Sequence, residues 1–327
     1  MDRIRIPSLS QAGLILALAL CLGATGASCT STRPVVKIGL IAPFEGLYRR
    51  SGYEALDAVR LAVAESPAAG IEFIPLAVDG GDDPVHTQRA VQKILADPAV
   101  RGLIGPLDPA LVAAASTVIS GTEALWLSPL HVAAEGGFLA PPAADDQFWA
   151  TELVRVIAAA ARAQGAQRMV LAGQMDGWPD LTDDEWSAAA EMQVRTAGEP
   201  DLTGADGDEQ VAVLHLGPPD AAAAALRRLR AAGSQASFWL GPAGGDPVFF
   251  ERAALAETVH WAIWSDREYN GWAQSHAPAT PAAYLVYLAA RQAIDTIVQA
   301  PNDPAAAWQV AVFELGADGI SRPIELR

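Results

Sequence analysis

The chain has 327 residues, of which 51% are hydrophobic, and its formal net charge is −16 at pH 7. A chain of about 300 residues can bury a sizeable apolar core and has room for two domains. The negative charge argues against nucleic acid and anionic lipid headgroups as partners, because both would repel it, and we interpret it as a source of solubility.

Residues 1–29 are typical of an export signal. Two early arginines precede the apolar run 14–22, which is too short to span a bilayer because spanning needs roughly 20 apolar residues. Gly26-Ala27-Ser28 then precedes Cys29, a pattern that resembles a bacterial lipobox, whose cysteine carries the lipid. We expect lipidation at Cys29 and a location in the periplasm or on the outer face of the cytoplasmic membrane. An ordinary signal peptide cleaved near Ala27 is the alternative.

The sequence contains two cysteines, Cys21 and Cys29, and removal of residues 1–28 would leave only the second. The net charge would become −17, because two Arg and one Asp would be lost. A single cysteine can form neither a disulfide within the chain nor a cysteine metal cluster. We therefore expect the apolar core to hold the exported chain together.

The chain after the signal alternates apolar strands with amphipathic helices. Pro75 in the second strand indicates an edge position or a bulge, because proline cannot donate a hydrogen bond to a neighbouring strand. Asp83 followed by Pro84 is typical of the N-cap and first residue of a helix. The first series of predicted elements comprises strands at 36–42, 71–78, 100–105 and 124–128 and helices at 53–65, 83–95 and 109–119.

A second series of the same kind follows. It comprises helices at 149–163, 185–193, 220–232 and 246–255 and strands at 168–173, 211–216, 237–240 and 259–264, and a helix at 281–298 and strands at 308–315 and 324–326 close the chain. These repeated strand–helix–strand units predict an α/β fold with two doubly wound parallel-sheet lobes. Because no linker separates the two series, we expect the chain to cross between the lobes in several short hinge strands.

Several segments, taken in order, resemble the type I periplasmic binding proteins of the branched-chain amino-acid (leucine-binding) family, the substrate-binding receptors of ABC importers. The matching segments are 38–46 with Gly52, 79–84, 100–106, 127–129, 138–145, 217–220, 231–233 and 283–297. They cover nearly all of the mature chain, and the specificity of the resemblance lies in their order and spacing rather than in any one motif.

The resemblance implies an extracytoplasmic receptor whose two lobes close on an amino acid or a related small polar molecule. It implies an ABC permease as the membrane partner, a monomer, and no cofactor. Residues 35–145 with 275–301 would form lobe 1, and residues 146–268 with 305–327 would form lobe 2.

The ligand would sit where parallel strands end and helix N-termini present free N–H groups. The loops at these strand ends supply the candidate ligand-binding residues. Those of lobe 1 are Phe44, Tyr48, Asp108, Ser128 and His131, and those of lobe 2 are Asp176, Trp178, Asp266 and Tyr269.

One departure from the family pattern affects the ligand. Relatives that bind amino acids carry Ser or Thr where this chain has Leu107-Asp108-Pro109, and again where it has Leu130-His131. Asp108 would repel an α-carboxylate and Pro109 has no N–H to donate to one. A cationic, polar or aromatic-stacked ligand therefore fits Asp108, Trp178 and Tyr269 better, although Asp108 is also a simple N-cap before Pro109.

We expect a binding protein rather than an enzyme. The sequence has no Gly-x-Ser-x-Gly elbow, no phosphate-binding P-loop and no Gly-x-Gly-x-x-Gly after the first strand. Its five histidines show no metal-ligand spacing, so we expect no metal. The alternative function is an envelope lipoprotein of the same fold that acts as a sensor or partner-binding regulator without transport.

Overall fold

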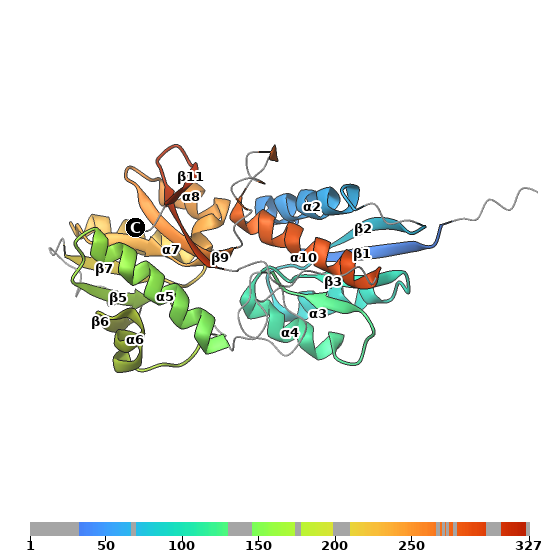
Figure 1. Ribbon diagram of the computed structural model, residues 1–327, viewed down its shortest axis with the longest axis horizontal. Helices are drawn as coiled ribbons and strands as arrows, with labels where there is room; N and C mark the ends of the chain where they lie inside the picture. The colour runs from blue at the N-terminus through green and yellow to red at the C-terminus, as the bar shows by residue number, and fades with distance from the viewer. Residues whose placement is uncertain are drawn as a thin grey trace, which may run out of the picture.

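The computed structural model describes residues 33–66, 70–129, 146–173, 178–198, 210–265, 269, 272, 275–276, 280–298 and 309–324. It shows two α/β bodies side by side along the long axis of the molecule (Figure 1). The first contains a four-stranded sheet in the order β2-β1-β3-β4, and the second a seven-stranded sheet in the order β11-β10-β9-β8-β7-β5-β6. We call these bodies lobe 1 and lobe 2. None of the described helices is long and apolar enough to cross a membrane.

Lobe 1 begins with the predicted strand–helix series. Its elements are β1 (Val35–Ala42), α2 (Arg49–Ala64), β2 (Glu72–Asp79), α3 (Pro84–Leu95), β3 (Val100–Ile104), α4 (Pro109–Ile119) and β4 (Leu125–Leu127). All of its strand pairs are parallel. Strand β2 lies at the edge of the sheet, which confirms the position predicted from Pro75, because an edge strand does not need the N–H that proline lacks.

The start of α3 also follows its predicted signal. The Asp83 side chain accepts hydrogen bonds from the backbone N–H groups of Val85 and His86, both at 2.9 Å, and Pro84 is the first helical residue. These bonds satisfy two of the donors that every helix start leaves free.

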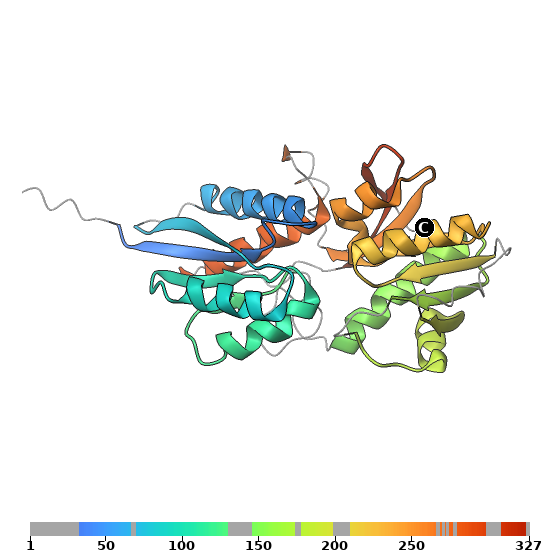
Figure 2. The ribbon, with the colours of Figure 1, turned by 180° about the vertical axis from the view of Figure 1, so that it is seen from behind.

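Helices cover both faces of the lobe 1 sheet (Figures 1 and 2). Leu40 and Ile41 are adjacent in β1 and fully buried, but they belong to different hydrophobic clusters, because successive side chains of a strand point to opposite faces. The cluster of Leu40 includes Val59 of α2, and that of Ile41 includes Val91 of α3 and Val112 of α4. Burial of each such side chain contributes roughly 1.5–3 kcal/mol.

Lobe 2 continues the alternation. Its elements are α5 (Asp146–Ala163), β5 (Arg168–Ala172), α6 (Asp183–Ala190), β6 (Gln193–Ala197), β7 (Val211–His215), α7 (Pro219–Ala231), β8 (Ser237–Leu240), the 3-10 helix η3 (Pro242–Gly245), α8 (Pro247–Ala253) and β9 (Val259–Ser265). Strands β5 to β9 pair in parallel, whereas β10 (Gln309–Leu315) and β11 (Ser321–Ile324) are antiparallel. The fold is thus the predicted α/β class with an antiparallel edge on the second sheet.

The prediction of a helix at 185–193 is wrong at the C-terminal end of that helix. Helix α6 stops at Ala190 because Glu191 adopts a left-handed conformation with φ 52°, and the edge strand β6 begins at Gln193. The capping box between Thr182 and Glu185 starts this helix two residues earlier than predicted.

The chain passes three times between the lobes. It leaves lobe 1 after β4, returns from β9 to α10 (Pro281–Ile297), which packs against α2, and leaves again for β10, which pairs with β9. Most of these three connections lie outside the described residues. The N-terminal ends of α2, α7 and α8 and the segments that follow β1, β2 and β3 meet at the junction of the lobes.

Candidate functional site

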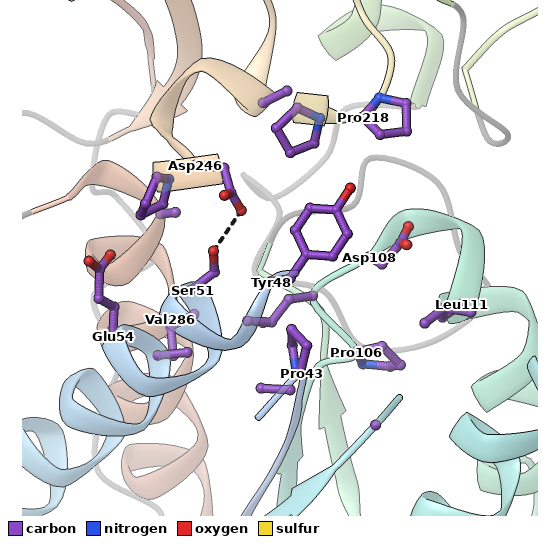
Figure 3. Close-up of a pocket in the computed structure, with 18 of the residues that line it drawn as sticks. Pro43, Tyr48, Ser51, Glu54, Pro106, Asp108, Leu111, Pro218, Asp246 and Val286 are labelled. Atoms are coloured by element: carbon purple, nitrogen blue, oxygen red, sulfur yellow. Dashed lines mark hydrogen bonds between the residues drawn. The ribbon is translucent and has the colours of Figure 1, made fainter. Parts of the chain in front are cut away.

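A cavity of about 150 Å³ lies between the two lobes (Figure 3). Lobe 1 contributes the segments that follow β1, β2 and β3 and the first turns of α2, while lobe 2 contributes the starts of α7, η3 and α8. Residues at the start of α10 close one side. This is the place where open α/β sheets bind ligands, outside the carboxyl ends of their strands.

Prolines form much of the cavity wall. They are Pro43, Pro106, Pro218, Pro219, Pro242 and Pro247. Three of them occupy the first position of α7, η3 and α8. Because proline has no backbone N–H, the helix starts that face the cavity present fewer donors than helix N-termini ordinarily offer to an anion.

The charged residues that line the cavity are all acidic: Glu54, Asp82, Asp108 and Asp246. Arg50 lies close by, and its guanidinium contacts Glu54 and Glu251 of α8, each at 3.1 Å. No Lys or Arg lines the cavity among the described residues.

Asp246 is a partly buried carboxylate of the cavity wall. It is the N-cap of α8, with one oxygen accepting from the Val248 N–H at 2.8 Å and the other from the Ser51 hydroxyl of lobe 1 at 2.8 Å (Figure 3). Burial raises the pKa of Asp246 to about 6, and the nearby carboxylates Glu54 and Glu251 push it in the same direction. The two hydrogen bonds only partly offset these effects.

Tyr48 spans the gap between the lobes. Its hydroxyl donates to the carboxylate of Asp220 in α7 at 2.8 Å. Burial, followed by the contact with Asp220, raises the pKa of Tyr48 well above its usual value, so this hydroxyl stays a donor.

Three contacts from one end of α2 thus join the lobes: Tyr48 to Asp220, Arg50 to Glu251, and Ser51 to Asp246. We call this set the clasp. All three acceptors are carboxylates of lobe 2, and their donors lie within four consecutive residues of lobe 1. Tyr48, Ser51 and Asp246 of the clasp also line the cavity.

Comparison with known protein families identifies the fold. The model of a family described as periplasmic binding protein matches residues 35–307, which is most of the chain. This chain belongs to the periplasmic binding protein family, of type I. The family consists of extracytoplasmic solute-binding receptors. No curated protein sequence matches the chain.

Solved structures share the fold of this periplasmic binding protein. A leucine binding protein from Thermotoga maritima MSB8 is 15% identical with a TM-score of 0.67, over 89% of this chain and 98% of that one. A branched-chain amino acid transporter substrate binding protein from Streptococcus pneumoniae, in complex with isoleucine, is 13% identical with a TM-score of 0.63, over 89% and 100%. A solute binding protein from R. palustris, in complex with 4-hydroxybenzoate, is 12% identical with a TM-score of 0.62, over 90% and 96%.

Two of the predicted ligand-binding residues, Tyr48 and Asp108, line the cavity of this periplasmic binding protein. Asp108 stands before α4, and its carbonyl accepts from the Leu111 N–H at 3.0 Å, as expected of a residue at the N-cap position. Phe44 lies beside the cavity rather than in its wall, with its ring edge-on to Tyr53 and its N–H bonded to Asp79 at 2.7 Å.

The structure places three other predicted residues away from the cavity wall. Ser128 is buried at the end of β4, and its hydroxyl makes no hydrogen bond to any described residue. Trp178 packs against the hydrophobic core. Tyr269 is 7% exposed and stands edge-on to Phe313 at 5.5 Å between ring centroids, within an aromatic cluster that also includes Tyr284.

His131, Asp176, Asp266 and the lipidation candidate Cys29 lie outside the described residues, and they stay predictions. Within the described part of the chain, no group of His, Cys, Asp or Glu residues could hold a metal ion.

Sequence reasoning missed Glu54, Ser51 and Asp246 as site residues. Asp246 and Pro247 repeat the Asp-Pro pattern that correctly marks the start of α3, and the sequence predicts a helix beginning at 246. That pattern locates a helix start but cannot show that the start faces the other lobe. Glu54 has no comparable signal, because its position in the cavity depends on which face of α2 meets lobe 2.

Proposed function

We propose that this periplasmic binding protein is the solute receptor of an ABC importer, with a small molecule bound between its lobes. The observation that supports this most is the cavity itself, which receives side chains from both lobes at the strand ends. Closure of the lobes around a ligand would bury it on all sides. A cavity of about 150 Å³ is large enough in other proteins to hold a benzene-sized molecule, so a small amino acid or a related molecule is of suitable size.

The proposal includes delivery of the solute to a permease in the membrane by a monomeric receptor. Solved relatives with this fold include a transporter substrate binding protein in complex with isoleucine and a solute binding protein in complex with 4-hydroxybenzoate. These two ligands differ in charge and shape, so the fold alone does not select a substrate.

A thermal-shift screen of the processed protein tests solute binding. We expect at least one compound among amino acids, amides, amines and small organic acids to raise the unfolding midpoint, because a ligand that binds only the folded state stabilises it. At about 100 times its Kd the gain is ~2.7 kcal/mol. No shift with any compound, from a well-folded sample, would favour the partner-binding regulator.

We also propose that Cys29 is lipidated and holds the receptor at the membrane. Cys29→Ser is expected to release the protein from the membrane fraction and to abolish incorporation of a labelled fatty acid, because serine offers no thiol for the lipid. Cys21→Ser should leave both unchanged. Equal membrane association of the wild type and Cys29→Ser would support an ordinary cleaved signal instead.

A further inference from the structure

The charge lining the cavity does not match an amino-acid zwitterion. A bound α-amino acid would place its carboxylate among Glu54, Asp82, Asp108 and Asp246. Arg50, which contacts the lining residue Glu54, also bonds to Glu251. The prolines at the starts of α7, η3 and α8 remove N–H groups that could otherwise hold an anion there.

Asp246 adds a requirement for positive charge. It is only partly exposed, and both of its hydrogen bonds come from neutral donors, the Ser51 hydroxyl and the Val248 N–H. The charged side chains that act on it most strongly are Glu54 and Glu251, which are acidic like itself. A carboxylate that has left bulk water is costly unless a cation pairs with it. A carboxylate offers about four lone-pair positions, so Asp246 can accept further bonds.

The remaining wall is apolar. Between the carboxylates lie the proline rings and aliphatic side chains such as Leu107, Leu111 and Val286. In Figure 3, Asp246 and Glu54 lie on one side of Tyr48, and Asp108 and Leu111 lie on the other. A ligand that satisfies both parts of this wall carries a positive head and a compact hydrocarbon body.

We propose that the cavity binds a small organic cation, an amine with an apolar body and no carboxylate. This inference rests on the proposed receptor function and specifies the substrate class of the same site. The ammonium would bond to Asp246, and the body would pack on the prolines and aliphatic side chains on the way to Asp108, which lies on the other side of Tyr48.

The test compares compounds that share one hydrocarbon body. 3-Methylbutylamine is leucine without its carboxylate, and 3-methylbutanoate has a carboxylate but no amine. 2-Phenylethylamine and phenylalanine, which differ in the same carboxylate, form a second pair. Titration calorimetry at pH 7.5 is expected to show that each amine binds at least about tenfold more tightly than the amino acid or acid of its set. A charge-assisted hydrogen bond between the ammonium and a carboxylate is strong enough to account for a tenfold difference in Kd.

Two variants connect the preference to the site. Asp246→Asn is expected to weaken amine binding about tenfold or more, because it removes the charge that the ammonium bonds while keeping the size of the side chain. Asp108→Asn is expected to weaken it by a smaller factor, because Asp108 acts on the ammonium from the other side of Tyr48. Asp83→Asn is the matched control, because Asp83 is also an N-cap before a proline but does not line this cavity. It should bind the amines like the wild type.

The outcomes separate this inference from the function on which it rests. Tighter binding of leucine, phenylalanine or 3-methylbutanoate than of the amines would overturn the cationic ligand and leave the solute receptor standing. Amine binding that neither Asp246→Asn nor Asp108→Asn weakens would overturn the assignment of the cavity. No binding by any of these compounds, together with no hit in the thermal-shift screen, would overturn both proposals.

Discussion

Alanine in place of Gly52 is expected to destabilise the protein by about 3 kcal/mol, at the upper end of the usual cost of overpacking, and to impair ligand binding. Gly52 lies in the first turns of α2, where the helix touches the loop after β1. A Cβ atom at this position would stand 1.8 Å from the carbonyl oxygen of Pro43, far inside contact distance. Because the obstructing atom belongs to the backbone, no side-chain rotation relieves the overlap.

The expected effect on binding follows from what the displaced groups do. Pro43 lines the cavity, and Tyr48, Arg50 and Ser51 of the clasp lie just before Gly52 in the chain. A shift of α2 away from Pro43 would move both the cavity wall and the clasp. Chemical denaturation should reveal the loss of stability, and calorimetry with the best ligand of the screen should reveal the loss of affinity.

Gly46→Ala provides the comparison. Gly46 has a left-handed backbone with φ 71°, but a Cβ atom added there would meet nothing within 4 Å, so alanine carries only a conformational cost of roughly 1 kcal/mol. Equal destabilisation by the two substitutions would contradict the close contact at Gly52.

Local sequence signals were sufficient to predict most of the fold. Buried parallel strands are nearly continuous apolar runs, as in β1 and β7, and the Asp-Pro pairs at 83–84 and 246–247 mark the starts of α3 and α8. The short edge strand β6 escaped prediction because its sequence, Gln193-Val-Arg-Thr-Ala197, is half polar and follows directly on a helix. Its place beside β5 is set by sheet pairing rather than by its own composition.

The site was predictable only where it depends on strand ends. Tyr48 and Asp108 follow β1 and β3, so the rule for open α/β sheets places them at the cavity. Asp246 meets Ser51 across 195 positions of sequence, and no local pattern contains that contact. The sequence predicts the aromatic Tyr269 in a crevice loop, whereas the structure buries it against Phe313. Its residue type could not distinguish the two positions, because an aromatic ring near a lobe junction serves packing as readily as ligand stacking.

Asp246→Asn is expected to make the unliganded protein more stable at pH 7.5 while it weakens amine binding. The pKa of Asp246 is about 6 in the folded protein, against an ordinary value of 3.8. Below pH 6 the folded state therefore holds this proton more tightly than the unfolded state, and stability rises as the pH falls from about 6 to 4. Above pH 6 the ionised carboxylate destabilises the fold. Asparagine removes that cost and still caps α8.

The gain should be about 1–2 kcal/mol at pH 7.5, since one pKa unit corresponds to about 1.4 kcal/mol and partial exposure of the carboxylate reduces the full effect. It should vanish near pH 4, where the wild-type side chain is also neutral. Unfolding midpoints of the wild type and Asp246→Asn at both pH values measure this, with Asp83→Asn expected to match the wild type within about 0.5 kcal/mol, because asparagine caps a helix as well as aspartate.

The charged groups around Asp246 determine how this result is interpreted. Glu54 of α2 and Glu251 of α8 are the charged groups that act on it, and Arg50 of α2 contacts both of these glutamates. Both glutamates remain in Asp246→Asn, and a difference that grows from about pH 4 to pH 6 and is then constant therefore belongs to Asp246. If the difference between wild type and variant were the same at pH 4 and pH 7.5, ionisation of Asp246 would not be its cause. If instead an amine ligand stabilised the wild type more than the variant at pH 7.5 and equally at pH 4, the cost of the unpaired carboxylate would be what the ligand relieves.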